Sequence, residues 1–261
     1  MIVPQPIQEL IDSSGNSFHA KVARWLTDNG WALQVSPYYL DPVQQKAREV
    51  DLIAEKAWPL NTMFGTPVGH VLVRLYIECK FVPGHAVFWF SEKSTAEAKT
   101  LVTSTGVFRA DNSYTNKHHY LSLSQRVAKL FTSSQTKGQE ADLFYKALNQ
   151  ILSAFVAFRS RAPSPQSLQG QLRGRIVLIE FPVIVCSSFQ NIYSADFLGQ
   201  GPTEAVQTPF QLEVRYAHDG ATGSHKNEYF LIDIASYDTL PVLMSAIAQD
   251  VDAAIVLKAS N

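Results

Sequence analysis

The sequence predicts an α/β protein in which a sheet is flanked by helices, and three observations support this fold class. An apolar stripe at helical spacing near the N-terminus is followed by three stretches with the alternation of strands. The longest helical pattern lies in the middle of the chain, and the last third is rich in strand patterns. Hydrophobic residues make up 46% and charged residues 17% of the chain, which is ordinary for a globular protein with a sizeable core.

The first elements are expected in the order helix, strand, strand, strand. Phe18, Val22 and Leu26 share one face of a helix, and Gly30 suits the left-handed residue beyond a helix end. The three strands are expected at 31–39, at 49–55 and at 71–81. Residues 56–70, which are rich in Pro, Asn and Gly, are expected to form a wide connection between the second strand and the third.

The stretch VLVRLYIECKF at 71–81 carries the most informative pattern. Side chains alternate across a strand, so one face is wholly apolar while the other carries Arg74, Glu78 and Lys80. Ionisable groups on a core strand are costly unless they are paired or bind a metal. A salt bridge between Glu78 and Lys80 on a solvated face would explain the pattern as well as a metal site would.

A second stretch, REVDLIAEK at 48–56, supplies another carboxylate. If its strand pairs antiparallel with the strand at 71–81, Asp51 approaches Glu78 and Lys80. Two carboxylates and a lysine that converge in this way form a hard, oxygen-rich site. Mg²⁺ prefers such a site and leaves its remaining positions to water and phosphate oxygens.

An Asp, a hairpin and then Glu-x-Lys resembles the signature of the PD-(D/E)XK nuclease superfamily. The matching residues are Asp51, Glu78 and Lys80, with Cys79 as the variable residue, and Val50 replaces the nominal proline. The resemblance implies a restriction-endonuclease-like mixed sheet with a helix-strand-strand-strand-helix-strand core, flanked by helices. Residues 1–135 would form this nuclease core, and residues 136–261 would add a helical segment and a strand-rich extension packed on it.

The resemblance also implies a function, the hydrolysis of phosphodiester bonds with Mg²⁺, for which Mn²⁺ can substitute. Asp51, Glu78 and the backbone carbonyl of Cys79 would hold the metal, and Lys80 would orient the attacking water. DNA is the favoured substrate because most relatives act on it, and many relatives work as homodimers. Two alternatives stay open: a non-catalytic nucleic-acid-binding or protein-interaction module with the same fold, and an unrelated α/β binding protein in which Glu78 and Lys80 form a structural pair.

Four further residues are candidates for substrate contacts. His19 stands nearest to the helical glutamate that the family often carries, although a lone histidine beside an apolar stripe also suits a structural role. Glu49 shares the strand face of Asp51, or else is a solvated charge. Arg173 and Arg175 lie at the far side of a loop at 162–174 that is rich in Pro, Ser, Gln and Gly. This loop would track phosphates unless it is a plain surface connection.

The remaining chain is expected to alternate between helices and strands. The histidines of Lys117-His118-His119 are expected at a solvated helix start, since neighbours on a helix do not face one site. Helices are expected at 94–106, 116–131, 140–161 and from 240, and strands at 107–109, 175–187, 210–216 and 229–235.

Charge and cysteine usage limit the function classes. The net charge is −1, so a nucleic-acid groove has to come from local clustering of Lys and Arg. Cys79 and Cys186 lie in apolar runs and are expected to be reduced core residues. The N-terminus lacks the basic start and apolar core of a signal peptide, and the run Ile176–Cys186 is too short to cross a bilayer. A soluble cytoplasmic protein without membrane partners is expected.

Overall fold

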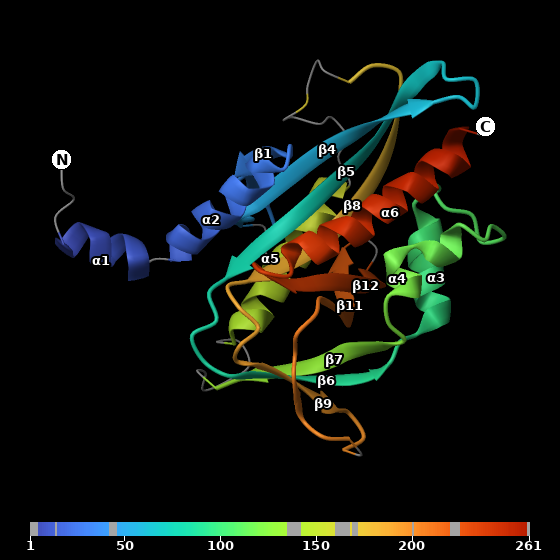
Figure 1. Ribbon diagram of the computed structural model, residues 1–261. Coiled ribbons are helices and arrows are strands. Elements are labelled where there is room, and N and C mark those ends of the chain that lie inside the picture. The colour runs from blue at the N-terminus through green and yellow to red at the C-terminus, as the bar shows by residue number, and fades with distance from the viewer. Residues whose placement is uncertain are drawn as a thin grey trace.

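The computed structural model describes residues 5–13, 15–41, 46–134, 142–159, 168, 172–199, 201–219 and 225–259. Within these ranges the chain is an α/β protein with a large mixed sheet flanked by helices (Figure 1). The described helices are α1 (Gln5–Ser13), α2 (Gly15–Asp28), α3 (Thr95–Ser104), α4 (His119–Ser122), α5 (Leu143–Arg159) and α6 (Leu240–Ala259), with a 3-10 turn η1 (Thr115–Lys117).

The described strands form one sheet of ten and one of two. The large sheet has the order β1-β4-β5-β8-β12-β11-β7-β6-β9-β10, and β2 pairs with β3 in the small one. The strands are β1 (Ala32–Val35), β2 (Tyr38–Leu40), β3 (Ala47–Glu49), β4 (Leu52–Asn61), β5 (Pro67–Lys80), β6 (Ala86–Glu92), β7 (Arg126–Ser133), β8 (Arg175–Cys186), β9 (Ile192–Asp196), β10 (Glu204–Ala205), β11 (Phe210–Asp219) and β12 (His225–Ser236).

The strands nearest the candidate site run as an antiparallel meander followed by a parallel strand. β1 and β4, and then β4 and β5, are antiparallel, whereas β5 and β8 are parallel from Gly69–Arg175 to Lys80–Cys186. β12 continues the sheet parallel to β8. Strands from residues 1–135 and from residues 136–261 are therefore hydrogen-bonded to each other in one sheet.

Two hydrophobic clusters lie on opposite faces of this sheet. One contains Val73, Leu75 and Ile77 of β5 together with apolar residues of α2, α3 and α6. The other contains Tyr76 of β5, Ile184 of β8 and the buried face of α5. In Figure 1, α6 crosses in front of β4, β5 and β8, and α5 lies behind them. The alternation of β5 thus sends its charged side chains toward the α5 face.

α6 is the one described helix that is long and apolar enough to cross a membrane. Half of the apolar stretch of this helix is buried inside the protein, and the buried residues include Leu243, Ile247 and Val251. These residues belong to the same cluster as the apolar face of β5. Its packing is that of a core helix in a soluble protein.

The sequence-based element boundaries were wrong in three places before β6. The strand expected at 49–55 is split between β3 in the small sheet and β4 in the large one. Residues 56–70 are mostly strand, because β4 extends to Asn61 and β5 begins at Pro67, so that a tight turn at 62–66 replaces the wide connection. The strand expected at 31–39 is two strands, because Ser36 has a positive φ of 49° immediately before Pro37. The helix expected near the N-terminus is confirmed as α2, with Gly30 left-handed at φ 78°.

The segment from 107 to 131 was also misassigned. No described strand covers 107–109, and the helix expected at 116–131 is a 3-10 turn, a single α-turn and then β7. Leu123 and Leu130, two of the residues that gave the helical pattern, are exposed at 55% and 54%. Val127 and Ala128 are buried where β7 pairs with β6, so pairing with a distant strand overrides the local spacing.

Close backbone contact between β5 and β8 requires glycine at position 69. A Cβ built on Gly69 would lie 1.9 Å from the carbonyl oxygen of Arg175. We expect Gly69→Ala to lower the free energy of unfolding by about 2–3 kcal/mol, because the two strands would have to separate. Gly15→Ala is the matched control, since nothing lies within 4 Å of its Cβ position. Urea unfolding checks this, and equal midpoints for the two variants would contradict it.

Candidate functional site

Asp51 and Glu78 are brought opposite each other by the pairing of β4 with β5. Leu52 of β4 pairs with Ile77 of β5. Because the strands are antiparallel, the residue before Leu52, Asp51, lies opposite the residue after Ile77, Glu78. Two backbone bonds fix the chain before β4: Ser36 N–H donates to the Asp51 carbonyl at 2.9 Å, and Val50 N–H to the Pro37 carbonyl at 3.3 Å. Directly opposed residues of antiparallel strands point to the same face. The expected convergence of Asp51 with Glu78 is therefore present.

Lys80 completes the group from the same face of β5. Its Nζ lies 2.8 Å from Oε2 of Glu78, and Glu78 is fully buried. Asp51 Oδ2 accepts a hydrogen bond from the backbone N–H of Cys79 at 2.7 Å. The three residues expected to form the site lie together, but Glu78 and Lys80 form a partly buried ion pair rather than the solvated one that the sequence also allowed.

One oxygen of Glu78 has no partner. Its Oε1 is buried and accepts no hydrogen bond within the described part of the chain. An unpaired buried carboxylate oxygen is costly, and a cation is one partner that relieves the cost. Asp51, which faces Glu78, likewise receives no hydrogen bond at Oδ1 from the described residues. Carboxylate oxygens are the ligand type that a hard divalent cation prefers.

Burial controls the protonation of this group. It raises the pKa of Glu78 to about 7, with Lys80 opposing and Asp51 adding to the rise. Burial also disfavours the charge on Lys80, but the contact with Glu78 outweighs it and the pKa of Lys80 is raised. The Cys79 thiol packs with the apolar cluster on the opposite face, and burial raises its pKa well above the usual value. Only the backbone carbonyl of Cys79 is therefore a candidate ligand.

This protonation gives a pH prediction. Because the pKa of Glu78 in the folded protein, about 7, exceeds its ordinary value of 4.5, metal-free protein should lose stability as the pH rises between these values. A metal ligand must be deprotonated, so we expect affinity for Mg²⁺ to fall about tenfold from pH 8 to pH 6. Calorimetric titration at both pH values measures this, and equal affinities would contradict it.

Gln150 of α5 and Tyr39 of β2 also lie at this site, and no sequence pattern pointed to either residue. Gln150 Oε1 accepts from Lys80 Nζ at 3.5 Å, and the Tyr39 hydroxyl donates to the Gln150 carbonyl at 3.1 Å. Burial raises the pKa of Tyr39 to about 12, so the hydroxyl stays protonated. Neither residue has a motif around it, and only the packing of α5 and β2 on the sheet brings them to Lys80.

The four residues expected to contact substrate lie elsewhere. His19 is on α2, which covers the sheet face opposite Glu78. Glu49 lies opposite Tyr38 in the small sheet, and its hydrogen bond raises the pKa of Tyr38.

Arg173 and Arg175 are at the far end of the sheet from Glu78. Arg175 pairs with Gly69, nine residues before Glu78, or roughly 30 Å along the strand. Both arginines are exposed. Of the loop expected at 162–174, residues 162–167 and 169–171 lie outside the described residues. The structure thus does not bring these arginines to the Asp51–Glu78 group.

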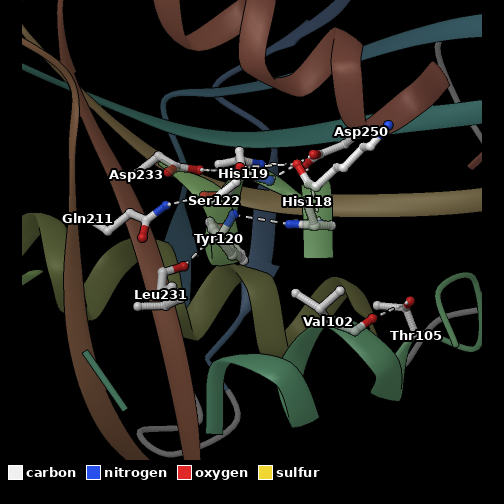
Figure 2. Close-up of polar contacts among 11 residues, drawn as sticks. Val102, Thr105, His118, His119, Tyr120, Ser122, Gln211, Leu231, Asp233 and Asp250 are labelled. Carbon is white, nitrogen blue, oxygen red and sulfur yellow. Dashed lines mark hydrogen bonds and ion pairs between the residues drawn. The ribbon is translucent and has the colours of Figure 1, made fainter. Parts of the chain in front are cut away.

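A second cluster of ionisable residues lies on the other face of the sheet, around His119 (Figure 2). His119 Nε2 lies 3.0 Å from Oδ2 of Asp233 in β12, and its Nδ1 contacts Oδ2 of Asp250 in α6. The His119 N–H also donates to Asp250 Oδ1 at 2.8 Å. His118 Nε2 lies 3.3 Å from Asp250 Oδ2, and both histidines are buried.

The expectation of a solvated helix start at these histidines was wrong. His118 is the N-cap of α4, with φ −54° and ψ 134°, so it lies outside the helix and its ring can stack on that of His119 at 5.0 Å. His118, His119 and Asp250 present atoms of a kind that binds metals, all within 4.8 Å of one another. This group could therefore hold a divalent metal.

The hydrogen bonds at the histidine cluster indicate which ring nitrogens carry protons. His118 Nδ1 accepts from the Tyr120 N–H at 3.1 Å, so in a neutral ring the proton is on Nε2, which then donates to Asp250. Burial lowers the pKa of His118 to about 3. Burial also opposes the charge on His119, but Asp250 and Asp233 outweigh it and raise its pKa to about 10. His119 is thus an imidazolium held between two carboxylates.

Comparisons of the chain with protein-family models, with curated proteins and with solved structures found no match.

Proposed function

We propose that the protein is a Mg²⁺-dependent phosphodiesterase that cuts nucleic acid, with its site at Asp51, Glu78 and Lys80. The observation that carries the proposal is the opposed carboxylate pair, in which Glu78 has a buried oxygen without a partner beside a charged lysine. The elements α2, β1, β4, β5, α5 and β8 follow one another in the order of a restriction-endonuclease-like core, which supports the proposal. Between them the chain inserts β2 and β3, and then β6, α3, α4 and β7, so the proposed core extends beyond residue 135.

Each residue has a task that follows from its surroundings. Asp51 and Glu78 would hold the metal, with the Cys79 carbonyl as a further ligand and Mn²⁺ as a possible substitute. The metal would lower the pKa of a bound water and neutralise charge on the phosphate. Lys80 stays protonated, so it would stabilise the negative charge that builds on the phosphate and orient the water through its N–H groups. Gln150 holds the Lys80 ammonium in place.

The proposed substrate class follows from the family resemblance. DNA is proposed because the resembling family acts mostly on DNA. The net charge of −1 and the distant positions of Arg173 and Arg175 leave long-range attraction to a duplex weak.

A non-catalytic module with the same fold is the second candidate, and one observation favours it. Glu78 has no exposed surface and already pairs with Lys80, as a structural ion pair would. Metal binding that Glu78→Gln abolishes separates the two candidates, because a purely structural pair at Glu78 and Lys80 gives no site for Mg²⁺ or Mn²⁺.

The test is a cleavage screen over plasmid, linear, nicked and single-stranded DNA and RNA, with Mg²⁺ or Mn²⁺. We expect cleavage with at least one substrate, lost on chelation and reduced roughly 10²- to 10⁴-fold by Lys80→Ala. Lys129→Ala is the matched control, because that lysine pairs with Glu213 away from the site. Cleavage that survives both Glu78→Ala and Lys80→Ala would remove the basis of the proposal.

A further inference from the structure

The central sheet contains a gap between β8 and β12. The two strands pair in parallel only from Val183–Asp233 to Cys186–Ser236, although β8 begins at Arg175 and β12 at His225. The pairing starts immediately after Pro182, which has no N–H to donate. A cavity of about 820 Å³ lies where the strands separate. Its walls come from both strands, from α3 and α4 on one face and from α5 on the other.

Along this gap the two strands do not hydrogen-bond to each other. On the side away from the gap, β8 pairs with β5 and β12 pairs with β11. On the side of the gap, alternate residues of each strand therefore direct their N–H and C=O groups into it. One of these groups, the Leu231 carbonyl, accepts from the Tyr120 hydroxyl at 2.9 Å. No backbone hydrogen bond joins residues 175–182 to residues 225–232, two ranges that the structure describes in full. The strand edges along the gap carry both backbone donors and backbone acceptors, so a molecule that supplies both kinds of group suits it.

Aromatic rings line the gap on both faces of the sheet. Tyr120 and Phe181 meet edge to face at 5.7 Å on the side of α4. Phe155 and Phe230 meet edge to face at 5.8 Å on the side of α5. A slot between such rings favours a flat ring that can stack or pack edge to face.

Two ion pairs and one exposed cation, Lys226, border the gap. Arg159 binds both carboxylate oxygens of Glu228, at 2.7 and 2.8 Å. Glu180 accepts from the Tyr76 hydroxyl at 2.7 Å and pairs with Arg74 at 3.3 Å. The pairs neutralise Arg159, Glu228 and Glu180, and Lys226 is exposed, so polar recognition inside the gap falls to the backbone edges.

We propose that the gap binds an uncharged heteroaromatic ring with hydrogen-bond donors and acceptors on its edge, the chemistry of a nucleobase. The volume is within the range of small-molecule sites, and the lining combines aromatic walls with a few backbone polar groups. The base can come from a free nucleoside or from an unpaired nucleotide of a strand. This site is separate from Asp51, Glu78 and Lys80 and does not depend on the proposed hydrolysis.

The test uses adenosine, guanosine, cytidine and uridine at about 1 mM, with melting temperature and calorimetry as readouts. A mixed-sequence DNA pentanucleotide and toluene are added as separate arms. We expect at least one nucleoside, or the pentanucleotide, to raise the melting temperature by a few degrees. Binding by the pentanucleotide alone would identify a strand as the source of the base. Binding of toluene alone, or of nothing, would overturn the proposal.

A pair of variants on α3 makes the test specific to the gap. Ser104 and Thr100 are both exposed, and each hydroxyl donates to a carbonyl of its own helix, but only Ser104 lines the cavity. Ser104→Trp should block the cavity and weaken binding at least tenfold, whereas Thr100→Trp should bind as the unmodified protein does. Because both sites are exposed, the substitutions should leave the fold intact. Equal binding by the two variants would also overturn the proposal.

Discussion

Glu78→Gln is expected to abolish Mg²⁺ binding and cleavage while leaving the protein folded. Glutamine has the size of glutamate and its amide oxygen can still accept from Lys80, so the packing around Lys80 and Gln150 is kept. The lost charge removes the ligand whose Oε1 has no partner among the described residues. We expect the affinity for Mg²⁺ to fall at least 10²-fold and cleavage to fall by about 10³-fold or more.

Glu180→Gln on β8 is the matched control for this variant. Glu180 is a partly buried carboxylate on the same sheet face, but its partners are Tyr76 and Arg74. We expect this variant to bind Mg²⁺ as tightly as the unmodified protein in calorimetric titration. Undiminished Mg²⁺ binding by Glu78→Gln would place the metal elsewhere, with the histidine cluster as the next candidate.

His119→Leu is expected to give the largest loss of stability, about 3–5 kcal/mol. The imidazolium of His119 is held between Asp233 and Asp250, and its removal leaves two buried carboxylates without their shared cation. In His118→Asn the asparagine oxygen can still accept from the Tyr120 N–H, so this variant should lose only about 1 kcal/mol. Urea unfolding at pH 7 compares the two, and similar losses would contradict the assignment of the charge to His119.

The pH dependence of unfolding tests the same assignment. The pKa of His119 in the folded protein, about 10, lies above its ordinary value of 6.5. Its contribution is therefore fully present below pH 6.5 and is lost as the pH rises through 10. The unmodified protein should lose stability over this interval, and the variant His119→Leu should lose less. A metal held by His118, His119 and Asp250 would instead make stability sensitive to chelators near neutral pH.

The amino-acid sequence by itself determined the candidate site, because strand alternation is a local property. Side chains alternate between the two faces of a strand, so the positions of Asp51, Glu78 and Lys80 in their segments assign all three to one face. The two segments are neighbours in the chain, and a hairpin between them can adopt only a few registers. The helix α2 and its end at Gly30 followed from the same kind of local pattern.

Only the tertiary structure decided what each polar residue contacts. Gln150 reaches Lys80 across 70 positions of the chain, and Asp250 reaches His119 across 131, so no local pattern contains either contact. Residues 116–131 have apolar residues at helical spacing, yet pairing with β6 makes the second half a strand. The gap between β8 and β12 likewise arises from two distant strands that separate at Pro182. Local spacing sets which face a side chain points to, whereas its burial and its partners depend on segments that only the folded chain brings together.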